Sequence, residues 1–225
     1  MKMKSRTGSS KPASVVASEG DLGRAERSPS TPESPSSLAA NALTPGLYVT
    51  ATPIGHARDV TLRALDVLKG CDVIAAEDTR VTSKLLAIYG IAKPLVAYND
   101  HNAARERPRL LARLKNGQSV ALVSDAGTPL VSDPGFKLVR EAIAEGVNVE
   151  AIPGASALLT ALVLAGLPSD RFLFAGFLPP RSGERRNALA ELKSIPASLV
   201  FFESPNRLGE SLADMATMLG ARSAA

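Results

Sequence analysis

The chain has 225 residues, of which 45% are hydrophobic, and a formal net charge of +4 at pH 7. A single cysteine, Cys71, excludes an internal disulfide, and we expect it to be a small buried apolar residue. Two histidines are too few for a Cys/His zinc site, and no run of about 18 apolar residues predicts a membrane span. The mild positive charge permits nucleic-acid binding without indicating it by itself. With no signal-peptide pattern at the N-terminus, these features predict a cytoplasmic protein without a metal.

Residues 1–44 differ in composition from the rest of the chain. They are rich in Ser and Pro, as in SPSTPESPSS, poor in large apolar residues, and without periodicity. Such a segment buries too little surface to offset the entropy lost on ordering. We therefore predict a disordered tail.

From residue 45 to residue 167, short apolar runs alternate with amphipathic segments. Strands are expected over 46–53, 71–77, 94–100, 119–124 and 148–154. Helices are expected over 61–70, 81–90, 103–117, 136–146 and 155–166, the third interrupted early by Pro108. Nearly continuous apolar strands that alternate with helices predict an α/β domain with a parallel sheet covered on both faces. Ligands of such sheets bind at the carboxyl ends of the strands, and every unusual polar motif of this chain falls there.

Residues 168–225 repeat this alternation on a smaller scale. Strands are expected over 172–180 and 198–207, and helices over 181–195 and 208–220. The pattern predicts the first part of a second α/β domain. Because a sheet of two strands is marginal alone, we expect the chain to be truncated before this domain is complete.

Two carboxylates and an arginine stand together in AEDTR, directly after the second predicted strand. One interpretation is structural: Asp78 caps the following helix and Arg80 pairs with a carboxylate. The other is functional: Arg80 holds an RNA phosphate or base, and Glu77 or Asp78 accepts a proton. His101, in the NDHN motif after the third strand, is a further candidate for the general base because imidazole titrates near neutral pH.

Three loops combine small residues with prolines at neighbouring strand ends: TPIG, DAGTP and IPGASA. They leave a trough of exposed backbone groups that suits a ligand with an amino-acid moiety and an adenosine; the alternative is three stiff loops without a ligand. Asp59 is expected to help cap the helix after TPIGHARD, and Ser156 to cap the helix after IPG. Asp133 and Pro134, in VSDPG, are expected to start the helix that follows them.

The chain closely resembles the ribosomal small-subunit RNA methyltransferase I family in motifs that stand in the same order: TPIGHARDVTLRAL, IAAEDTR, DHN, ALVSDAGTPLVSDPG, IPGASALLTAL, AGLPSDRF, GFLPP and FFESPNR. The resemblance spans about residue 45 to the C-terminus. It implies a tetrapyrrole-methylase fold of two α/β domains with S-adenosylmethionine in the cleft between them. It further implies methylation of the 2′-hydroxyl of a cytidine in the decoding region of 16S rRNA, on the 30S subunit, by a homodimer.

The resemblance also assigns roles to residues. It implies cofactor contacts at Ser124, Asp125, Ala126, Gly127, Thr128, Pro129, Pro153, Gly154, Ser156 and Ala157. It places Thr52, Pro53, Ile54 and Gly55 on the substrate side, with Glu77, Asp78, Thr79 and Arg80 beside them. We favour Asp78 or Glu77 as the base, and expect Arg185, Arg186 and Arg207 to contact phosphates.

This sequence departs from the family pattern at three points. His56 stands where the family usually has Asn, and Ala155 where it often has Pro. The family also continues with a segment that completes the second domain and helps to enclose the adenosine. Two other functions stay open: a methyltransferase of the same fold acting on a tetrapyrrole carbon, and a truncated, inactive remnant that binds RNA. The first is disfavoured because those relatives carry a G-x-G-x-G-D loop where this chain has TPIGH.

Overall fold

The computed structural model describes residues 43–225, so the predicted disordered tail lies outside the described residues except for its last two. A five-stranded sheet is built from β1 (Gly46–Thr50), β2 (Val73–Ala76), β3 (Leu95–Ala97), β4 (Ser119–Val123) and β5 (Val149–Ile152). The strand order is β3-β2-β4-β1-β5 and every neighbouring pair is parallel. All five carboxyl ends therefore meet at one edge of the sheet, as the alternating sequence pattern predicts.

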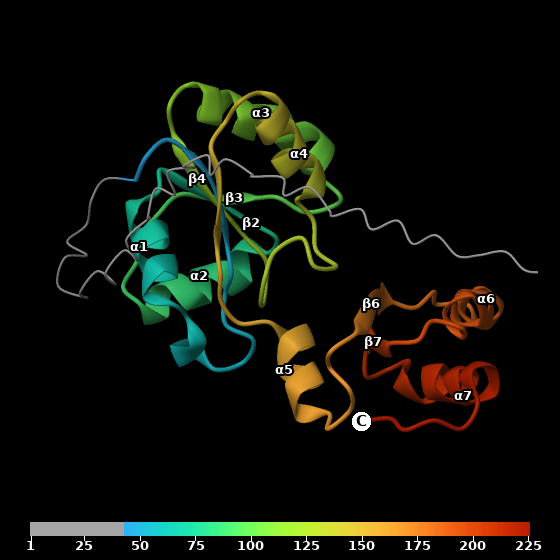
Figure 1. The fold of residues 1–225 in the computed structure, drawn as a ribbon. Coiled ribbons are helices and arrows are strands. Elements are labelled where there is room, and N and C mark those ends of the chain that lie inside the picture. Colours follow the sequence, from blue (N-terminus) through green and yellow to red (C-terminus); the bar gives the residue numbers. More distant parts are fainter. Residues whose placement is uncertain (1–42) are drawn as a thin grey trace, which may run out of the picture. The chain divides into compact units, whose positions relative to one another are not determined.

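Helices cover both faces of this sheet (Figure 1). α1 (Leu62–Gly70) and α2 (Thr79–Ile88) pack on one face, together with side chains such as Tyr48 and Ile74. α3 (Ala103–Lys115) and α4 (Phe136–Ala144) pack on the other, against Leu47 and Val73. Successive residues of a strand thus serve opposite cores, which is why the strands read as continuous apolar runs.

Hydrogen-bonding side chains fix where several helices begin. α1 begins after Thr61, whose hydroxyl accepts a hydrogen bond from the backbone amide of Ala64 (3.1 Å). The expectation that Asp59 caps this helix is wrong: Asp59 lies in the short 3-10 helix η2 (Ala57–Asp59) that precedes it. Asp78 caps α2 and Ser156 caps α5 (Ala157–Leu164), as expected.

Pro108 lies inside α3 without ending it. A proline at this position removes one intrahelical hydrogen bond and crowds the carbonyl four residues earlier, which is the reason a break was expected. The buried Leu110, Leu111 and Leu114 that follow it hold the helix on the sheet. Tertiary packing thus overrides the local preference.

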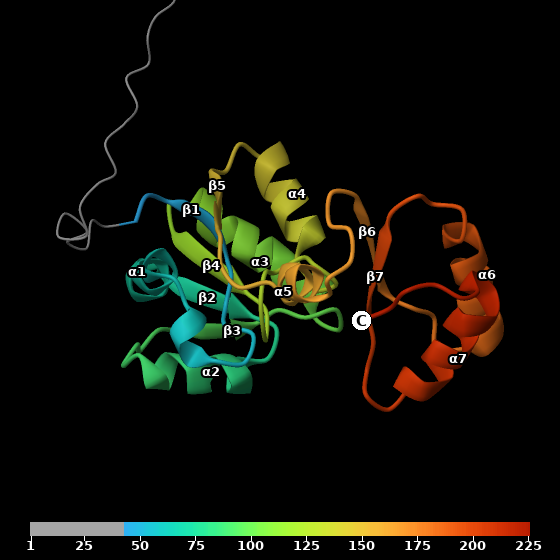
Figure 2. The same ribbon diagram turned by 60° about the horizontal axis from the view of Figure 1, so that its bottom comes forward.

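The C-terminal residues form a second, two-stranded parallel sheet of β6 (Phe172–Phe177) and β7 (Ser198–Phe202). α6 (Ser182–Leu192) and α7 (Leu208–Leu219) follow these strands and pack against each other on one side of them (Figure 2). The α/β architecture is confirmed, whereas the domain boundary at 167/168 stays a prediction. None of the helices between residues 43 and 225 is long and apolar enough to cross a membrane.

Candidate functional site

The loops after β1 and β4 are joined by their backbones. Thr52 and Gly127 form an isolated antiparallel bridge, in which each amide donates to the other residue's carbonyl (2.8 and 3.1 Å). The buried hydroxyl of Thr52 also donates to the carbonyl of Ser124 (3.3 Å). Gly127 has φ +81°, and a Cβ there would lie 3.3 Å from Cγ2 of Ile54. The backbone conformation therefore favours glycine here, and a side chain would in addition make a tight contact with Ile54 of TPIG.

Carboxylates join the loop after β2 to the loop after β4. The backbone amide of Asp78 donates to Oδ1 of Asp125 (3.0 Å), and the amide of Asp125 donates to Oε2 of Glu77 (3.4 Å). This reciprocal pair brings together residues from AEDTR and SDAGTP, which are separated by more than 40 positions in the chain. Both loops are thereby held in one conformation at the edge of the sheet.

Glu77, Asp125 and Asp133 form a carboxylate cluster at this edge of the sheet. The pKa values of Glu77 and Asp133 are raised. Burial raises the pKa of Glu77, and the neighbouring charges of Asp133, Asp125 and Asp100 raise it further, against a hydrogen bond from the amide of Asp125. Burial likewise raises the pKa of Asp133, with a hydrogen bond from Ser124 opposing it. Clustering and partial burial of like charges are the environment in which a carboxyl group becomes a useful proton acceptor near neutral pH.

The expectation that Asp133 starts the next helix is wrong. α4 begins after Gly135 without any side-chain cap, and the carboxyl group of Asp133 faces Ser124 instead. Asp133 therefore belongs to the carboxylate cluster, where sequence reasoning had given it a structural role. The loop that carries it also holds Leu130 (φ 73°) and Ser132 (φ 68°) in the left-handed region. Strained backbone of this kind clusters at functional sites.

Asp78 and Arg80 form an exposed pair. The Asp78 carboxylate accepts from the backbone amide of Arg80 (2.8 Å) and from its guanidinium (2.5 Å). The bonds from Arg80 hold the pKa of Asp78 down at about 2. The structural interpretation of AEDTR is thus confirmed, and a carboxylate with so low a pKa is a weak proton acceptor. Glu77 is the better candidate for the base.

The loop after β3 supports Glu77 from the other side. Nδ2 of Asn99 donates to the carbonyl of Glu77 (3.3 Å), while its Oδ1 is buried and has no hydrogen-bond partner among the described residues. Oδ1 of Asn102 accepts from the amide of Asn99 (2.9 Å) and fixes the turn. His101 is exposed in this turn, and its side chain makes no hydrogen bond within residues 43–225.

The loop after β5 is also joined to the loop after β4. The hydroxyl of Thr128 donates to the carbonyl of Ala155 (3.3 Å), which joins SDAGTP to IPGASA. A Cβ on Gly154 would lie 2.9 Å from Cβ of Ala51, so glycine is needed for this approach. Ser124, Gly127 and Pro129 are buried in their loop, whereas other predicted cofactor residues are exposed: Asp125, Ala126, Pro153, Gly154 and Ala157.

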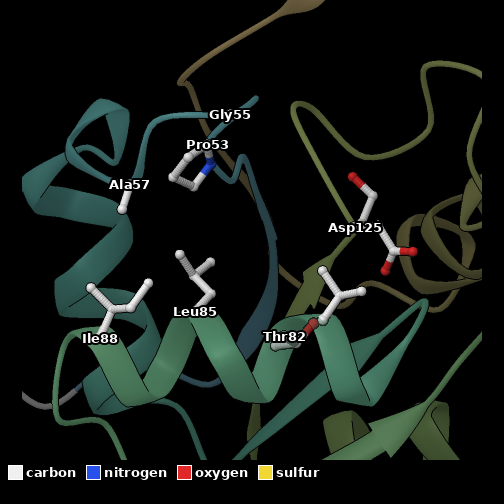
Figure 3. A pocket seen from close by; sticks show the side chains of 9 residues that line it. Pro53, Gly55, Ala57, Thr82, Leu85, Ile88 and Asp125 are labelled. Atoms are coloured by element: carbon white, nitrogen blue, oxygen red, sulfur yellow. The ribbon is translucent and has the colours of Figure 1, made fainter.

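A pocket of about 190 Å³ opens between TPIGHA and α2 (Figure 3). Its apolar wall includes Pro53, Leu85 and Ile88, and Asp125 lies at its polar end. Thr82 contributes a nearly buried side chain from α2. The α2 residues were missed by sequence reasoning, although their spacing of three to four residues places them on one helix face. The substituted His56 keeps a local role: its Nδ1 accepts from the amide of Arg58 (3.3 Å).

The three arginines predicted to contact phosphates lie in α6 and the loop before α7, and each is already engaged. Arg185 is 1% exposed and pairs with Asp214 (2.7 Å). Arg186 pairs with the same carboxylate (2.6 Å), and Arg207 pairs with Glu203 (2.7 Å). The prediction for Arg185 is corrected, because a buried guanidinium with a full set of partners cannot reach a phosphate. Arg186 and Arg207 stay as weaker candidates.

Within residues 43–225, no three His, Cys, Asp or Glu side chains are grouped so that they could hold an ion. Cys71 is buried, as expected, and burial raises the pKa of its thiol to about 11. It is therefore unsuited to act as a nucleophile or ligand at neutral pH.

Residues 46–224 match the family model described as tetrapyrrole (corrin/porphyrin) methylases. The chain belongs to this family. It is 57% identical over 183 residues to the ribosomal RNA small subunit methyltransferase I of Mesorhizobium japonicum, and 52% identical over 174 residues to that of Pseudomonas aeruginosa. These alignments cover 81% and 77% of this chain, and the chain spans 62% of the length of each of these two relatives.

Solved structures agree with this assignment. Uroporphyrin-III-C-methyltransferase from Thermus thermophilus is 25% identical, with a TM-score of 0.55 over 76% of this chain and 72% of that one. A structure of uroporphyrin-III C-methyltransferase from the same organism, in complex with S-adenosyl homocysteine, is 22% identical, with a TM-score of 0.56 over 79% and 78% of the two chains. The latter similarity supports the fold alone.

Proposed function

We propose that this protein is an S-adenosylmethionine-dependent methyltransferase that modifies the 2′-hydroxyl of a cytidine in the 16S rRNA of the small ribosomal subunit. The proposal rests on the relatives at 50–57% identity that carry the name ribosomal RNA small subunit methyltransferase I. It extends to the decoding region as the target, to a cytoplasmic location and to a homodimer. The structural observation that carries it is that hydrogen bonds join the loops after β1, β2, β4 and β5, with a carboxylate cluster between them, at one edge of the sheet.

The loops fit the proposed cofactor. Gly127 and Gly154 occupy positions that a Cβ would crowd, so backbone groups line the trough. Asp125 and Asp133 place negative charge beside it, which complements the cationic sulfonium and ammonium groups of S-adenosylmethionine. The cofactor, when bound, supplies an activated methyl group, and the residues proposed to hold it are those of SDAGTP and IPGASA.

The protein's own contribution is to orient the ribose and to accept its proton. A ribose hydroxyl is a poor nucleophile until its proton leaves, and Glu77 is the carboxylate whose pKa is shifted in the useful direction. The bond from the Asp125 amide to Glu77 fixes where the proton acceptor lies. Arg80, exposed beside it, is proposed to position the RNA.

Transfer of a tritiated methyl group from S-adenosylmethionine to isolated 30S subunits tests this function. Label is expected on 16S rRNA, in a nuclease-resistant dinucleotide, because a 2′-O-methyl group blocks cleavage at that position. Label on no RNA, with saturable cofactor binding retained, would exclude the RNA substrate while leaving the cofactor proposal intact. Label in a nuclease-sensitive position would contradict the 2′-hydroxyl as acceptor.

A further inference from the structure

α3 concentrates the positive charge of the chain. It carries five basic residues and one acidic residue, Glu106, in 13 positions, whereas the whole chain has a net charge of only +4. Arg105, Arg109 and Arg113 follow each other at intervals of four residues and are all exposed. Residues so spaced lie on one helix face, about 6 Å apart along the axis. The result is an exposed stripe of guanidinium groups.

α4 continues this surface. α3 and α4 pack side by side on the same face of the sheet, and Arg107 pairs with Glu141 across them (2.9 Å). Lys137 and Arg140 are exposed on α4, and the Arg140 guanidinium lies 5.7 Å from the centre of the exposed Phe136 ring. We call the exposed stripe on α3, together with Phe136, Lys137 and Arg140, the α3–α4 face.

The acidic groups of these helices do not neutralise the α3–α4 face. Glu106 pairs with both Arg105 (2.8 Å) and Arg109 (3.0 Å). Glu141 pairs with Arg107, and Glu145 pairs with Lys115. Within residues 43–225, Arg113, Lys137 and Arg140 pair with no carboxylate. Uncompensated exposed cations attract phosphates and release counterions when they bind them.

The position of this face connects it to the candidate site. α3 follows the loop after β3 and α4 follows the loop after β4, so both helices begin at the sheet edge that carries Glu77 and Asp125. An RNA strand lying across their first turns would reach that edge. Phe136, exposed under a guanidinium, offers the flat surface on which unpaired bases stack.

We propose that the α3–α4 face binds the sugar-phosphate backbone of the RNA substrate and leads it to the carboxylate cluster. This inference rests on the proposed function for the identity of the RNA, and it replaces α6 with α3 and α4 as the main phosphate-binding element. Arg105, Arg109 and Arg113 contact phosphates along α3, and Lys137 and Arg140 contact those nearest the site.

Salt-dependent binding tests the proposal. The probe is a fluorescein-labelled RNA hairpin with a single-stranded loop, followed by anisotropy over a range of salt concentrations. Lys137→Gln/Arg140→Gln should lower the slope of log K against log salt by about 2, and adding Arg113→Gln by about 1 more. None of the three residues pairs with a carboxylate among the described residues, so their removal leaves no buried charge behind.

Lys69→Gln/Lys84→Gln is the matched control, because it removes two exposed charges from α1 and α2 on the opposite face. A slope equal to that of the control would overturn the proposal, as would a variant that loses binding to phosphatidylserine vesicles but not to RNA. Calorimetry with S-adenosylmethionine should give the same affinity for all variants. Failure of the proposed function is separable: the wild-type chain would then bind the hairpin with a normal slope but methylate no 30S subunit.

Discussion

Glu77 is the side chain that we propose as the proton acceptor of the reaction. Replacement by glutamine keeps its size but removes the proton acceptor, so the rate of methyl transfer should fall by about 10²–10⁴-fold. The affinity for S-adenosylmethionine should stay within a factor of about two, because the change is isosteric. Single-turnover transfer to 30S subunits measures the rate, and Asp66→Asn, on the exposed part of α1, is the control.

The pH profile gives a second readout of the same residue. The pKa of Glu77 is raised above 4.5, so the deprotonated, proton-accepting form increases as pH rises through that raised value. The wild-type rate should therefore rise with pH in a range above 4.5, and this rise should be absent in Glu77→Gln. A glutamine variant with the wild-type rate and pH profile would assign the proton to another acceptor.

Comparing alanine substitutions at Gly127 and Gly117 distinguishes the cost of backbone strain from the cost of a loop contact. Gly127 and Gly117 have φ values of +81° and +78°, but only at Gly127 would a Cβ meet other atoms within 4 Å. Alanine at either position should cost about 1–2 kcal/mol for the left-handed conformation. Gly127→Ala should cost more, since it also pushes Ile54 and strains the bridge to Thr52. Urea unfolding of the two variants measures the difference, and equal losses would show that the contact is unimportant.

At the scale of elements, a buried ion pair joins α6 to α7. Asp214 accepts from Ser182, Arg185 and Arg186, whereas Arg185 donates to Asp214 and to the carbonyls of Pro179 and Pro180. Asp214→Leu should therefore lower the melting temperature more than Arg185→Leu, because among the described residues it leaves the buried Arg185 guanidinium with only the exposed carboxylate of Glu210, at 3.8 Å, as an anionic partner. The double variant should lose less than the sum of the single changes. Additive losses would contradict a direct coupling.

The ion pair between Asp214 and its arginine partners predicts that the stability of the protein falls in acid. Its arginine partners hold the pKa of Asp214 at about 2, below its usual 3.8. A carboxylate with a lowered pKa stabilises the fold fully above its unfolded pKa, and this contribution is lost as pH falls from 3.8 towards about 2. The melting temperature of Asp214→Leu should consequently fall less steeply over this range than that of the wild type.

Local sequence patterns predict the elements well because each depends on neighbours in the chain. Apolar runs place all seven strands found between residues 43 and 225, and Asp78 and Ser156 cap the helices expected of them. The errors arise where a side chain chooses between local and distant partners. Asp133 turns from its helix towards Ser124, and Arg185 is buried by Asp214, 29 positions away. Hydrophobic periodicity depends on residues that are close in the sequence, so it cannot predict partners that are distant in the sequence.

At the scale of the whole molecule, the candidate site and the charged residues near it lie at one edge of the five-stranded sheet. The parallel order β3-β2-β4-β1-β5 brings five loops together there, and hydrogen bonds between these loops fix the row. The carboxylates lie in the loops after β2 and β4, whereas the exposed cations lie on helices that start from the same edge. Opposite charges thus remain separated although they lie near one another. Under the proposed function, this separation would let the negative site accept a cationic cofactor while the positive face attracts RNA.

Cofactor binding should therefore be visible as a change in the stability of the entire chain. A ligand that binds only the folded state at 100 times its dissociation constant adds about 2.7 kcal/mol to the free energy of unfolding. We expect S-adenosylmethionine to raise the melting temperature in a saturable manner. Adenosine alone should raise it less, because it lacks the cationic groups that Asp125 and Asp133 attract. Gly127→Ala should abolish most of the shift and Gly117→Ala should keep it, since only Gly127 lies in the loop proposed to hold the cofactor. Equal shifts in the two glycine variants would place the cofactor elsewhere.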